Sequence, residues 1–258
     1  MNFCVSMVAS GNIYQYTAMM AAATYKHILN DVRVMVFLPQ NEKIDSKLRH
    51  FSRSYGFELL RLQVPFLETK GVGRLIAVRH VLKLKAEWFK QSYNNSDCHV
   101  LFVDSDTVCV NEPDFSGYSV GIGLAHDLNP KYSSDHTDPD SKFFISEDNR
   151  SKYRNSGVML ADRNSQDFYV RFGEIVSECC DSYNQKFADQ CIINYLIHTE
   201  FKDRLYDLDK KYNHLNGRMS LALERDESIS IFHSGWGFNN NKGKGSGHHK
   251  ICMRILDG

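Results

Sequence analysis

The stretch FCVSMVASGNIYQYTAMMAAATYKHILNDVRVMVFL, residues 3–38, decides the fold class. Its first apolar run, 3–8, is rich in β-formers and predicts a strand. The Ala- and Met-rich sequence that follows has helical spacing and predicts a helix over 14–29. The run VRVMVFL then predicts a second strand over 32–38. Because two strands joined by a helix usually lie parallel in one sheet, the stretch predicts a βαβ unit.

The same alternation of strand and helix patterns continues along the chain. Further strands are expected at 57–64, 99–103, 119–125 and 158–161, and further helices at 45–55, 71–90, 165–180 and 187–199. The sequence shows no internal repeat and no interdomain linker. We therefore expect an α/β fold with a mostly parallel central sheet flanked by helices, in a single domain spanning 1–258. Such sheets bind ligands at the carboxyl ends of their strands.

Charge and cysteine content exclude several classes of protein. The 258 residues carry 31 Lys plus Arg and 31 Asp plus Glu, which argues against a dedicated nucleic-acid-binding protein but leaves room for a small anionic ligand. The seven cysteines include no C-x-x-C pair, so reduced thiols in a cytoplasmic protein are expected. The sequence shows neither a signal peptide nor a transmembrane run. Contact with a membrane face through a partner stays open.

Two carboxylates follow the strand predicted at 99–103. In VLFVDSDTVCV, Asp104 and Asp106 are separated only by the small Ser105, so both can reach one cation. Hard divalent cations prefer such oxygen ligands and leave positions for water or phosphate oxygens. The alternative is an acidic turn that ends the strand without binding anything.

A histidine follows another short apolar run near the C-terminus. In ISIFHSGWG, His233 could supply a third ligand to a metal held by the two aspartates. Gly235 lies two residues later, and Lys242 and Lys244 lie in a glycine-rich, basic segment suited to folding over phosphates. The alternative for that segment is a solvated tail.

Two further motifs place neutral polar residues beside apolar runs. Asn155-Ser156-Gly157 leads into the strand pattern at 158–161, where an amide could bind a polyhydroxylated ligand while glycine admits close backbone approach. Asp189-Gln190 opens the helix at 187–199. Taken separately, the first motif is only a turn that starts a strand, and Asp189 only a stabilising acid at a helix N-terminus.

The motifs VASGNIY, FVDSD, NSGVML, ADQCIINYL and FHSGW occur in one order along almost the whole chain. In that order they resemble the motifs of the nucleotide-sugar glycosyltransferases of the GT-A fold. The likeness is to the retaining group that includes glycogenin and the bacterial lipooligosaccharide galactosyltransferases, glycosyltransferase family 8. The resemblance implies a GT-A fold with a nucleotide-binding half at about 1–110 and an acceptor and catalytic half at about 111–258.

The resemblance also implies roles for individual residues. Asp104, Asp106 and His233 match the family's ligands for manganese, a cofactor that Mg²⁺ could replace. The residues that match its catalytic and donor-sugar positions are Asn155, Asp189 and Gln190. The nucleotide-sugar contacts would come from Ala9, Ser10, Asn12, Tyr14, Ser105 and Gly235.

Two positions depart from the family pattern. Family members follow the histidine with Lys-Pro-Trp, whereas this chain reads HSGWGFNNNKGKG, so Lys242 and Lys244 compete for the diphosphate. The family also has a Lys or Arg followed by Leu on the helix before its aspartates. Arg74-Leu75 fits that pattern but lies far from Asp104 in sequence, and Arg79 is the alternative.

The resemblance predicts a metal-dependent enzyme that moves a hexose from a UDP-sugar to the hydroxyl of a carbohydrate or glycoconjugate acceptor, with retention of anomeric configuration. The polar, acidic segment 126–150 would then be an acceptor-side lid. Two other readings stay open. One is a metal-dependent nucleotide-sugar hydrolase or nucleotidyltransferase, and the other is a sugar-nucleotide-binding protein without activity.

Overall fold

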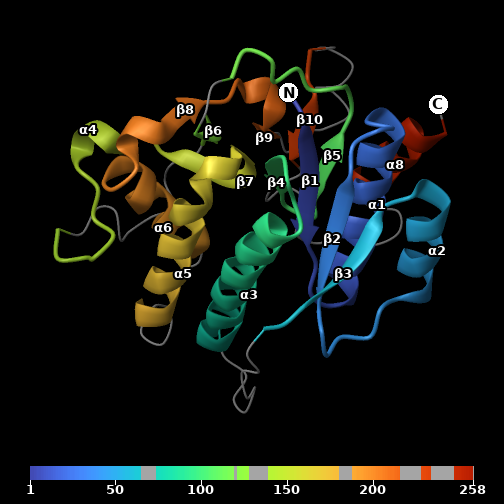
Figure 1. Ribbon diagram of the computed structural model, residues 1–258, viewed down its shortest axis with the longest axis horizontal. Helices are drawn as coiled ribbons and strands as arrows, with labels where there is room; N and C mark the ends of the chain where they lie inside the picture. Colours follow the sequence, from blue (N-terminus) through green and yellow to red (C-terminus); the bar gives the residue numbers. More distant parts are fainter. Residues whose placement is uncertain are drawn as a thin grey trace.

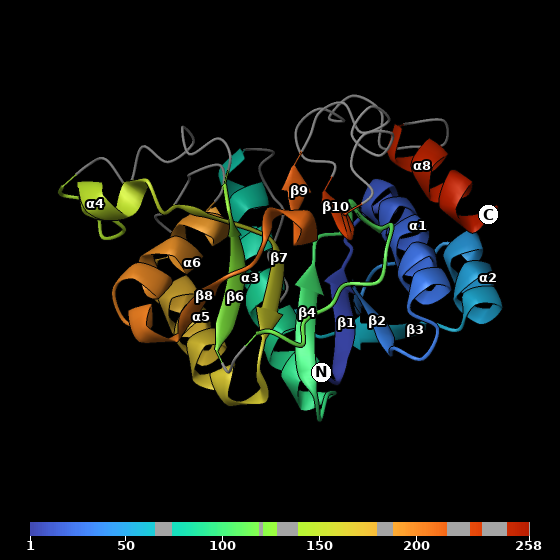
Figure 2. The same cartoon turned by 90° about the horizontal axis from the view of Figure 1, so that it is seen from above.

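A central sheet of seven strands organises the chain (Figures 1 and 2). The computed structural model describes residues 1–64, 74–118, 121–127, 139–179, 188–215, 228–233 and 247–257. The strand order is β3-β2-β1-β4-β7-β6-β8. These strands are β1 (Phe3–Val8), β2 (Val34–Pro39), β3 (Glu58–Leu62), β4 (His99–Val103), β6 (Ile122–His126), β7 (Arg154–Ala161) and β8 (Leu205–Asp207). Only β7 runs antiparallel to its neighbours, so the predicted mostly parallel α/β sheet is confirmed.

A second, three-stranded sheet begins just beyond the carboxyl end of β4. Its order is β5-β10-β9, formed by β5 (Thr107–Cys109), β10 (Ile231–His233) and β9 (His214–Leu215). β5 follows β4 directly along the chain, and β10 pairs with it in antiparallel register. The small sheet therefore brings residues near the C-terminus to the carboxyl end of β4.

The strands of the large sheet are buried on both faces. In β4, Leu101 and Val103 belong to one apolar cluster, whereas Val100 and Phe102 belong to the other. This alternation follows from the two-residue period of a strand, and it explains why VLFV is apolar throughout.

Helices cover both faces of the sheet (Figure 2). The first cluster is closed by α1 (Asn12–Ile28), α2 (Ser46–Tyr55) and α8 (Gly247–Leu256). The second is closed by α3 (Arg74–Asn94), α5 (Gln166–Cys179) and α6 (Ala188–His198). Short helical segments complete the described chain at α4 (Glu147–Arg150), Arg163–Ser165, Lys202–Arg204 and Lys210–Tyr212.

The structure differs from the sequence expectations in two segments. Asn155-Ser156-Gly157 lies inside β7 rather than in a turn before it, where Gln190 of α6 accepts the Ser156 N–H and the N–H of Asp104, just after β4, donates to the Gly157 carbonyl. The described part of the C-terminal segment, 247–257, is not a solvated tail: it contains the helix α8, which packs on α1, where the Tyr16 hydroxyl contacts His249 Nδ1 at 2.7 Å. Its sequence GHHKICMRIL has an apolar face at helical spacing.

The segment predicted as a lid, 126–150, is described at 126–127 and 139–150. Phe143 and Ile145 are buried there, and Phe143 joins the cluster under α5 and α6. The remainder, 128–138, lies outside the described residues, so closure over a substrate stays a prediction.

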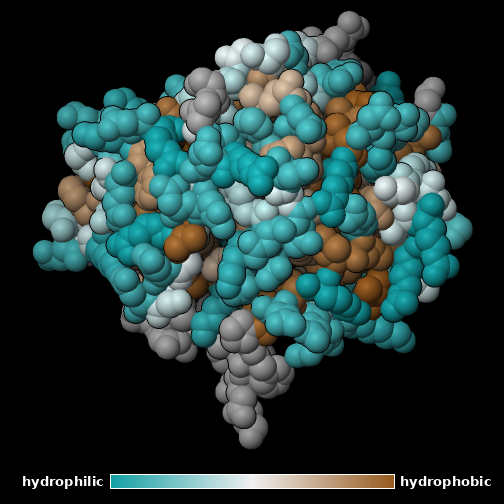
Figure 3. All heavy atoms as spheres, viewed as in Figure 1, coloured by the Kyte–Doolittle hydropathy of each residue, from teal (hydrophilic) through white to brown (hydrophobic). Residues whose placement is uncertain are grey.

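The face of the molecule drawn in Figure 3 is largely hydrophilic, and apolar atoms reach it only in separate patches. Within the described ranges, no helix combines the length and apolarity that a membrane span requires.

A half-buried histidine at the end of α6 is expected to make stability depend on pH. Burial, and then the positive charge of Arg154, lower the pKa of His198 from 6.5 to about 4. Below about pH 6.5 His198 is protonated in the unfolded chain but stays neutral in the folded protein. Acidification to about pH 5 should therefore lower the unfolding free energy by about 1–2 kcal/mol through this residue. His198→Gln should remove that loss, measured by urea unfolding at the two pH values. The exposed His27→Gln is the control, and an equal effect of both variants would contradict the assignment.

Candidate functional site

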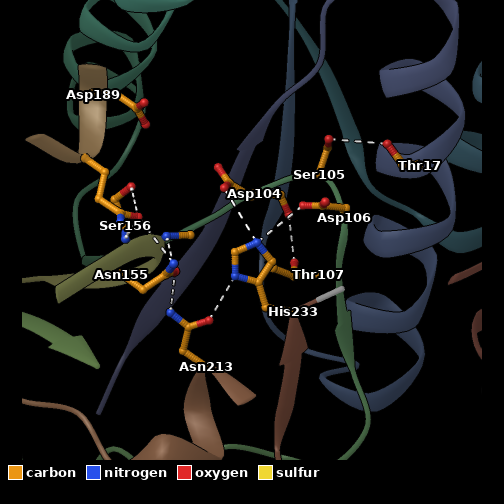
Figure 4. Close-up of polar contacts among 12 residues, drawn as sticks. Thr17, Asp104, Ser105, Asp106, Thr107, Asn155, Ser156, Asp189, Asn213 and His233 are labelled. Carbon is orange, nitrogen blue, oxygen red and sulfur yellow. Dashed lines mark hydrogen bonds and ion pairs between the residues drawn. The ribbon is translucent and has the colours of Figure 1, made fainter. Parts of the chain in front are cut away.

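The candidate site begins in the turn between β4 and β5. The backbone of Asp104 donates from its N–H to the Gly157 carbonyl at 2.8 Å, and the Thr107 hydroxyl donates to the Asp104 carbonyl at 2.8 Å. Buried Ser105 accepts a hydrogen bond from Thr17 of α1 at 3.3 Å. The turn is therefore fixed from both sides, and Asp104 and Asp106 project from it (Figure 4).

His233 reaches the same point from β10. In the antiparallel pairing of β10 and β5 it lies opposite Thr107, one residue after Asp106. Its Nε2 lies 3.5 Å from Asp106 Oδ1 and 3.8 Å from Asp104 Oδ2. Figure 4 shows both carboxylates directed at the imidazole ring.

These three side chains fit a divalent cation. One ligand atom from each of Asp104, Asp106 and His233 lies within 4.8 Å of the others. Two carboxylate oxygens and one imidazole nitrogen suit Mn²⁺ or Mg²⁺. The local charge agrees: burial alone would lower the pKa of His233, but the hydrogen bond and charge of Asp106, with the charge of Asp104, raise it overall. The two carboxylates thus favour positive charge at this point of the site.

A glycine makes room for the imidazole. A Cβ at Gly157 of β7 would lie 2.0 Å from His233 Cε1 and 2.5 Å from Nδ1. No side chain fits at these distances unless the buried ring moves. The glycine of the N-S-G motif therefore allows the histidine to approach β7.

Gly157→Ala is expected to displace His233 and to weaken Mn²⁺ binding by about 10–100-fold, a loss typical of disturbed metal-ligand orientation. Mn²⁺ affinity can be measured by electron paramagnetic resonance titration. Gly173→Ala on α5 is the matched control, because nothing lies within 4 Å of its added Cβ. Unchanged affinity in Gly157→Ala would show that His233 does not bind the ion.

A lysine not chosen from the sequence bridges two acids of the site. Lys85 of α3 donates from Nζ to Asp189 Oδ2 at 2.6 Å and to Asp104 Oδ1 at 3.2 Å. Its side chain is only 10% exposed. Burial opposes its charge, but Asp104 and Asp189 together raise the pKa of Lys85 well above its usual value. The family resemblance instead points to Arg74 or Arg79 as the functional cation of this helix.

Gln190 of α6 is held by β7 and by the strand end beside it. Its Oε1 accepts from the Ser156 N–H at 3.1 Å and from Asn155 Nδ2 at 3.2 Å. Its Nε2 donates to Asp127 Oδ2 at 2.9 Å, directly after β6. The structure therefore brings the predicted Asn155 and Gln190 into contact and adds Asp127.

The predicted nucleotide contacts in the first half lie at the same edge of the sheet. Ala9 is buried just after β1, and Asn12 begins α1. Tyr14 is an exposed side chain on the first turn of that helix. Gly11 has φ +81, which lets the chain turn sharply from strand to helix.

Glu42, another residue that the sequence analysis did not select, ties this turn to β2. It accepts from the Gly11 N–H at 2.7 Å and from the Ser10 hydroxyl. The sequence offers one indication of this role, because Glu42 shortly follows β2, a strand that ends at the same edge of the sheet as β1.

Several predicted residues are not placed. Arg74 and Arg79 belong to α3, but their side chains are outside the described part of the chain. Gly235, Lys242 and Lys244 fall in 234–246, also outside it. Their diphosphate contacts stay predictions.

Comparison with solved structures finds the same fold in glycosyltransferases. The galactosyltransferase LgtC, solved in complex with donor and acceptor sugar analogues, is 16% identical with a TM-score of 0.61, over 98% of this chain and 95% of that one. The bifunctional glycosyltransferase WbbM is 13% identical with a TM-score of 0.62, over 100% of this chain and 52% of that one. The glycosyltransferase GlyE of Streptococcus pneumoniae is 13% identical with a TM-score of 0.57, over 99% of this chain and 60% of that one.

No protein-family model matches the chain, and neither does any curated protein sequence. The likeness at these low identities is one of fold, and it spans nearly every residue. The chain therefore has the fold of the GT-A glycosyltransferases, the fold that the order of its motifs predicts.

Proposed function

We propose that the protein is a metal-dependent glycosyltransferase that moves a hexose from a UDP-sugar to an acceptor hydroxyl with retention of configuration. The observation that carries the proposal is the group Asp104, Asp106 and His233 at the carboxyl edge of the sheet, in a chain of GT-A fold. The donor would lie across this edge, with its uridine near Ala9, Ser10, Asn12 and Tyr14.

Cleavage of a sugar–diphosphate bond builds negative charge on the departing phosphate. A divalent cation held by the three residues, Mn²⁺ or Mg²⁺, would supply electrostatic stabilisation of that charge. Asp104 and Asp106, whose oxygens face His233, would hold the ion, and Lys242 or Lys244 would add further positive charge at the diphosphate. The departing phosphate oxygen can accept the proton of the acceptor hydroxyl, so the proposal needs no ionised base among the protein residues.

Lys85 and Asp189 hold the donor side of the site. The ammonium fixes the Asp189 carboxylate, which would then orient donor hydroxyls through its remaining lone pairs. Because Lys85 also contacts Asp104, the ion pair links the donor-sugar residues with the metal ligands.

Retention by double displacement needs a carboxylate nucleophile. In hydrolases it is paired with an acid about 5–5.5 Å away. Asp189 is tied to Lys85, and Gln190 is a poor nucleophile, so we favour front-face transfer through an oxocarbenium-like state. Gln190 would stabilise positive charge on the reacting carbon through its Oε1. That oxygen now accepts hydrogen bonds from Asn155 and Ser156, so it must give up one of them to face the sugar. A glutamine belongs to the active site of LgtC, for which a glutamine-to-glutamate active-site mutant was solved.

The acceptor would be a carbohydrate or glycoconjugate, as the sugar analogues bound to LgtC suggest. We place the reaction in the cytoplasm. The six described cysteines are free thiols, as expected in a reducing compartment.

The test is a panel of nucleotide sugars with Mn²⁺, scored by UDP release with and without oligosaccharide acceptors. A single UDP-sugar that is hydrolysed slowly alone, and turned over faster with one acceptor, is the expected result. Free sugar or pyrophosphate formed without dependence on an acceptor would favour the hydrolase or nucleotidyltransferase reading. If UDP binds with metal and no nucleotide sugar turns over, the protein is a binding protein and the proposal is wrong.

A further inference from the structure

A row of hydrogen-bonded side chains joins the metal ligand His233 to Gln190. His233 Nδ1 contacts Asn213 Oδ1 at 3.1 Å, and Asn213 Nδ2 donates to Asn155 Oδ1 at 2.9 Å. Asn155 Nδ2 then reaches Gln190 Oε1 at 3.2 Å. Figure 4 shows Asn213 between the imidazole and Asn155. Asn213 was not selected from the sequence.

Backbone groups fix the direction of every bond in this row. The Gly157 N–H can only donate, and it contacts Asn155 Oδ1 at 2.9 Å. The Ser156 N–H likewise identifies the atom that it contacts on Gln190 as the oxygen. Reversing either amide would set donor against donor, so the oxygen and nitrogen positions are determined.

The same logic extends to the imidazole. Because Asn155 Oδ1 needs a donor, Asn213 presents its Nδ2 there and its Oδ1 to His233. An acceptor at Nδ1 requires the proton on Nδ1. Nε2 is then the nitrogen whose lone pair binds a cation, once that cation replaces a proton held between Nε2 and the carboxylates of Asp104 and Asp106. Metal-binding histidines are usually oriented by such a partner of the second ring nitrogen.

Asn213 is built to hold this position. It is buried, and it directly follows the short helix Lys210–Tyr212, whose Lys210 carbonyl accepts its N–H at 3.2 Å. A buried amide with both ends satisfied has little freedom to rotate.

We propose that Asn213 is a positioning residue that sets the tautomer of His233 and, through Asn155, couples the metal ligands to the donor-sugar residues. The inference rests on the proposed function for its second half. The first half concerns the imidazole alone and can be tested without any sugar.

Two variants separate the two ends of Asn213. Asn213→Asp keeps an oxygen for His233 but loses the donor to Asn155. Asn213→Ala loses both bonds, and Asn213→Ser replaces it if the alanine variant does not fold. Asn95→Ala is the matched control, because within the described ranges the Asn95 side chain bonds only the Gln91 carbonyl, at 2.8 Å.

The first readout is the His233 tautomer, measured by nitrogen NMR of the metal-free protein at alkaline pH, where the imidazole is neutral. Wild type and Asn213→Asp should show more of the Nδ1-protonated form than Asn213→Ala, in which Asp104 and Asp106 hold the proton on Nε2. Mn²⁺ affinity should fall about 10–100-fold in Asn213→Ala and stay equal or rise in Asn213→Asp.

The second readout is transfer at saturating Mn²⁺, where kcat should fall at least about 10-fold in both variants, a typical loss for a supporting residue. A purely structural role would lower metal affinity in both variants alike, and that result, or an unchanged tautomer in Asn213→Ala, would overturn the inference. If wild type transfers no sugar while the tautomer and affinity results hold, the proposed function fails and the metal-ligand half of the inference stands.

Discussion

Asp106→Asn is expected to lower acceptor-dependent transfer by about 1,000-fold and to remove measurable Mn²⁺ binding at micromolar concentration. Asp106 is the carboxylate nearer to His233, at 3.5 Å, and its side chain is only 12% exposed. The substitution preserves shape and removes one negative charge from a group of three ligands. The protein should still fold, because an asparagine amide can keep a contact with the imidazole.

The experiment compares UDP release and Mn²⁺ titration in wild type, Asp106→Asn and Asp31→Asn. Asp31 is an exposed aspartate in the turn before β2, so its substitution controls for the loss of one negative charge. Normal transfer by Asp106→Asn would remove the metal from the mechanism. Loss of transfer with Mn²⁺ affinity unchanged would show that Asp106 acts on the substrate and not on the ion.

The sheet and its reactive edge could be predicted because local patterns determine both. VLFV reads as a strand buried on both faces, and β4 has the predicted bounds, His99–Val103. Once the strands are parallel, residues that follow β1 and β4 must meet at one edge. Asp104 and Asp106 therefore needed no tertiary information.

The lengths of α3 and β4 alone point to Lys85, whereas the family pattern directs attention to Arg74 or Arg79. α3 and β4 are joined by a short turn, so the helix leads back along the strand. A strand rises about 3.3 Å per residue and a helix about 1.5 Å, so Asp104 should be level with a residue about ten positions before the helix end at Asn94. That position is near Lys85, three turns closer to β4 than Arg74.

Asn213 had no such signal. It lies in the stretch KKYNHL, which shows neither a clear period nor a charge pattern. Its place depends on β9 and β10 pairing in parallel, with Leu215 opposite His233. Pairing between segments that distant in sequence depends on packing of the whole fold, which single-sequence patterns do not encode.

Lys85→Met is expected to reduce transfer by about 100-fold, because it removes the one described cation that contacts both Asp104 and Asp189. It should also lower the unfolding free energy of the metal-free protein by about 2–3 kcal/mol, since it leaves partly buried carboxylates without their partner. Lys85→Arg keeps the charge but not the compact ammonium, so we expect partial recovery of activity.

The effect of a divalent metal on the melting temperature tests the role of the Lys85 charge more directly. In Lys85→Met the two aspartates of the turn lack the ammonium, so Mg²⁺ should raise the melting temperature more than it does in wild type. Lys83→Met is the control, because Lys83 lies on the same helix and no ion pair is described for it within the part of the chain that the structure covers. Equal losses in Lys83→Met and Lys85→Met would mean that helix packing, and not the Lys85 charge, supports transfer.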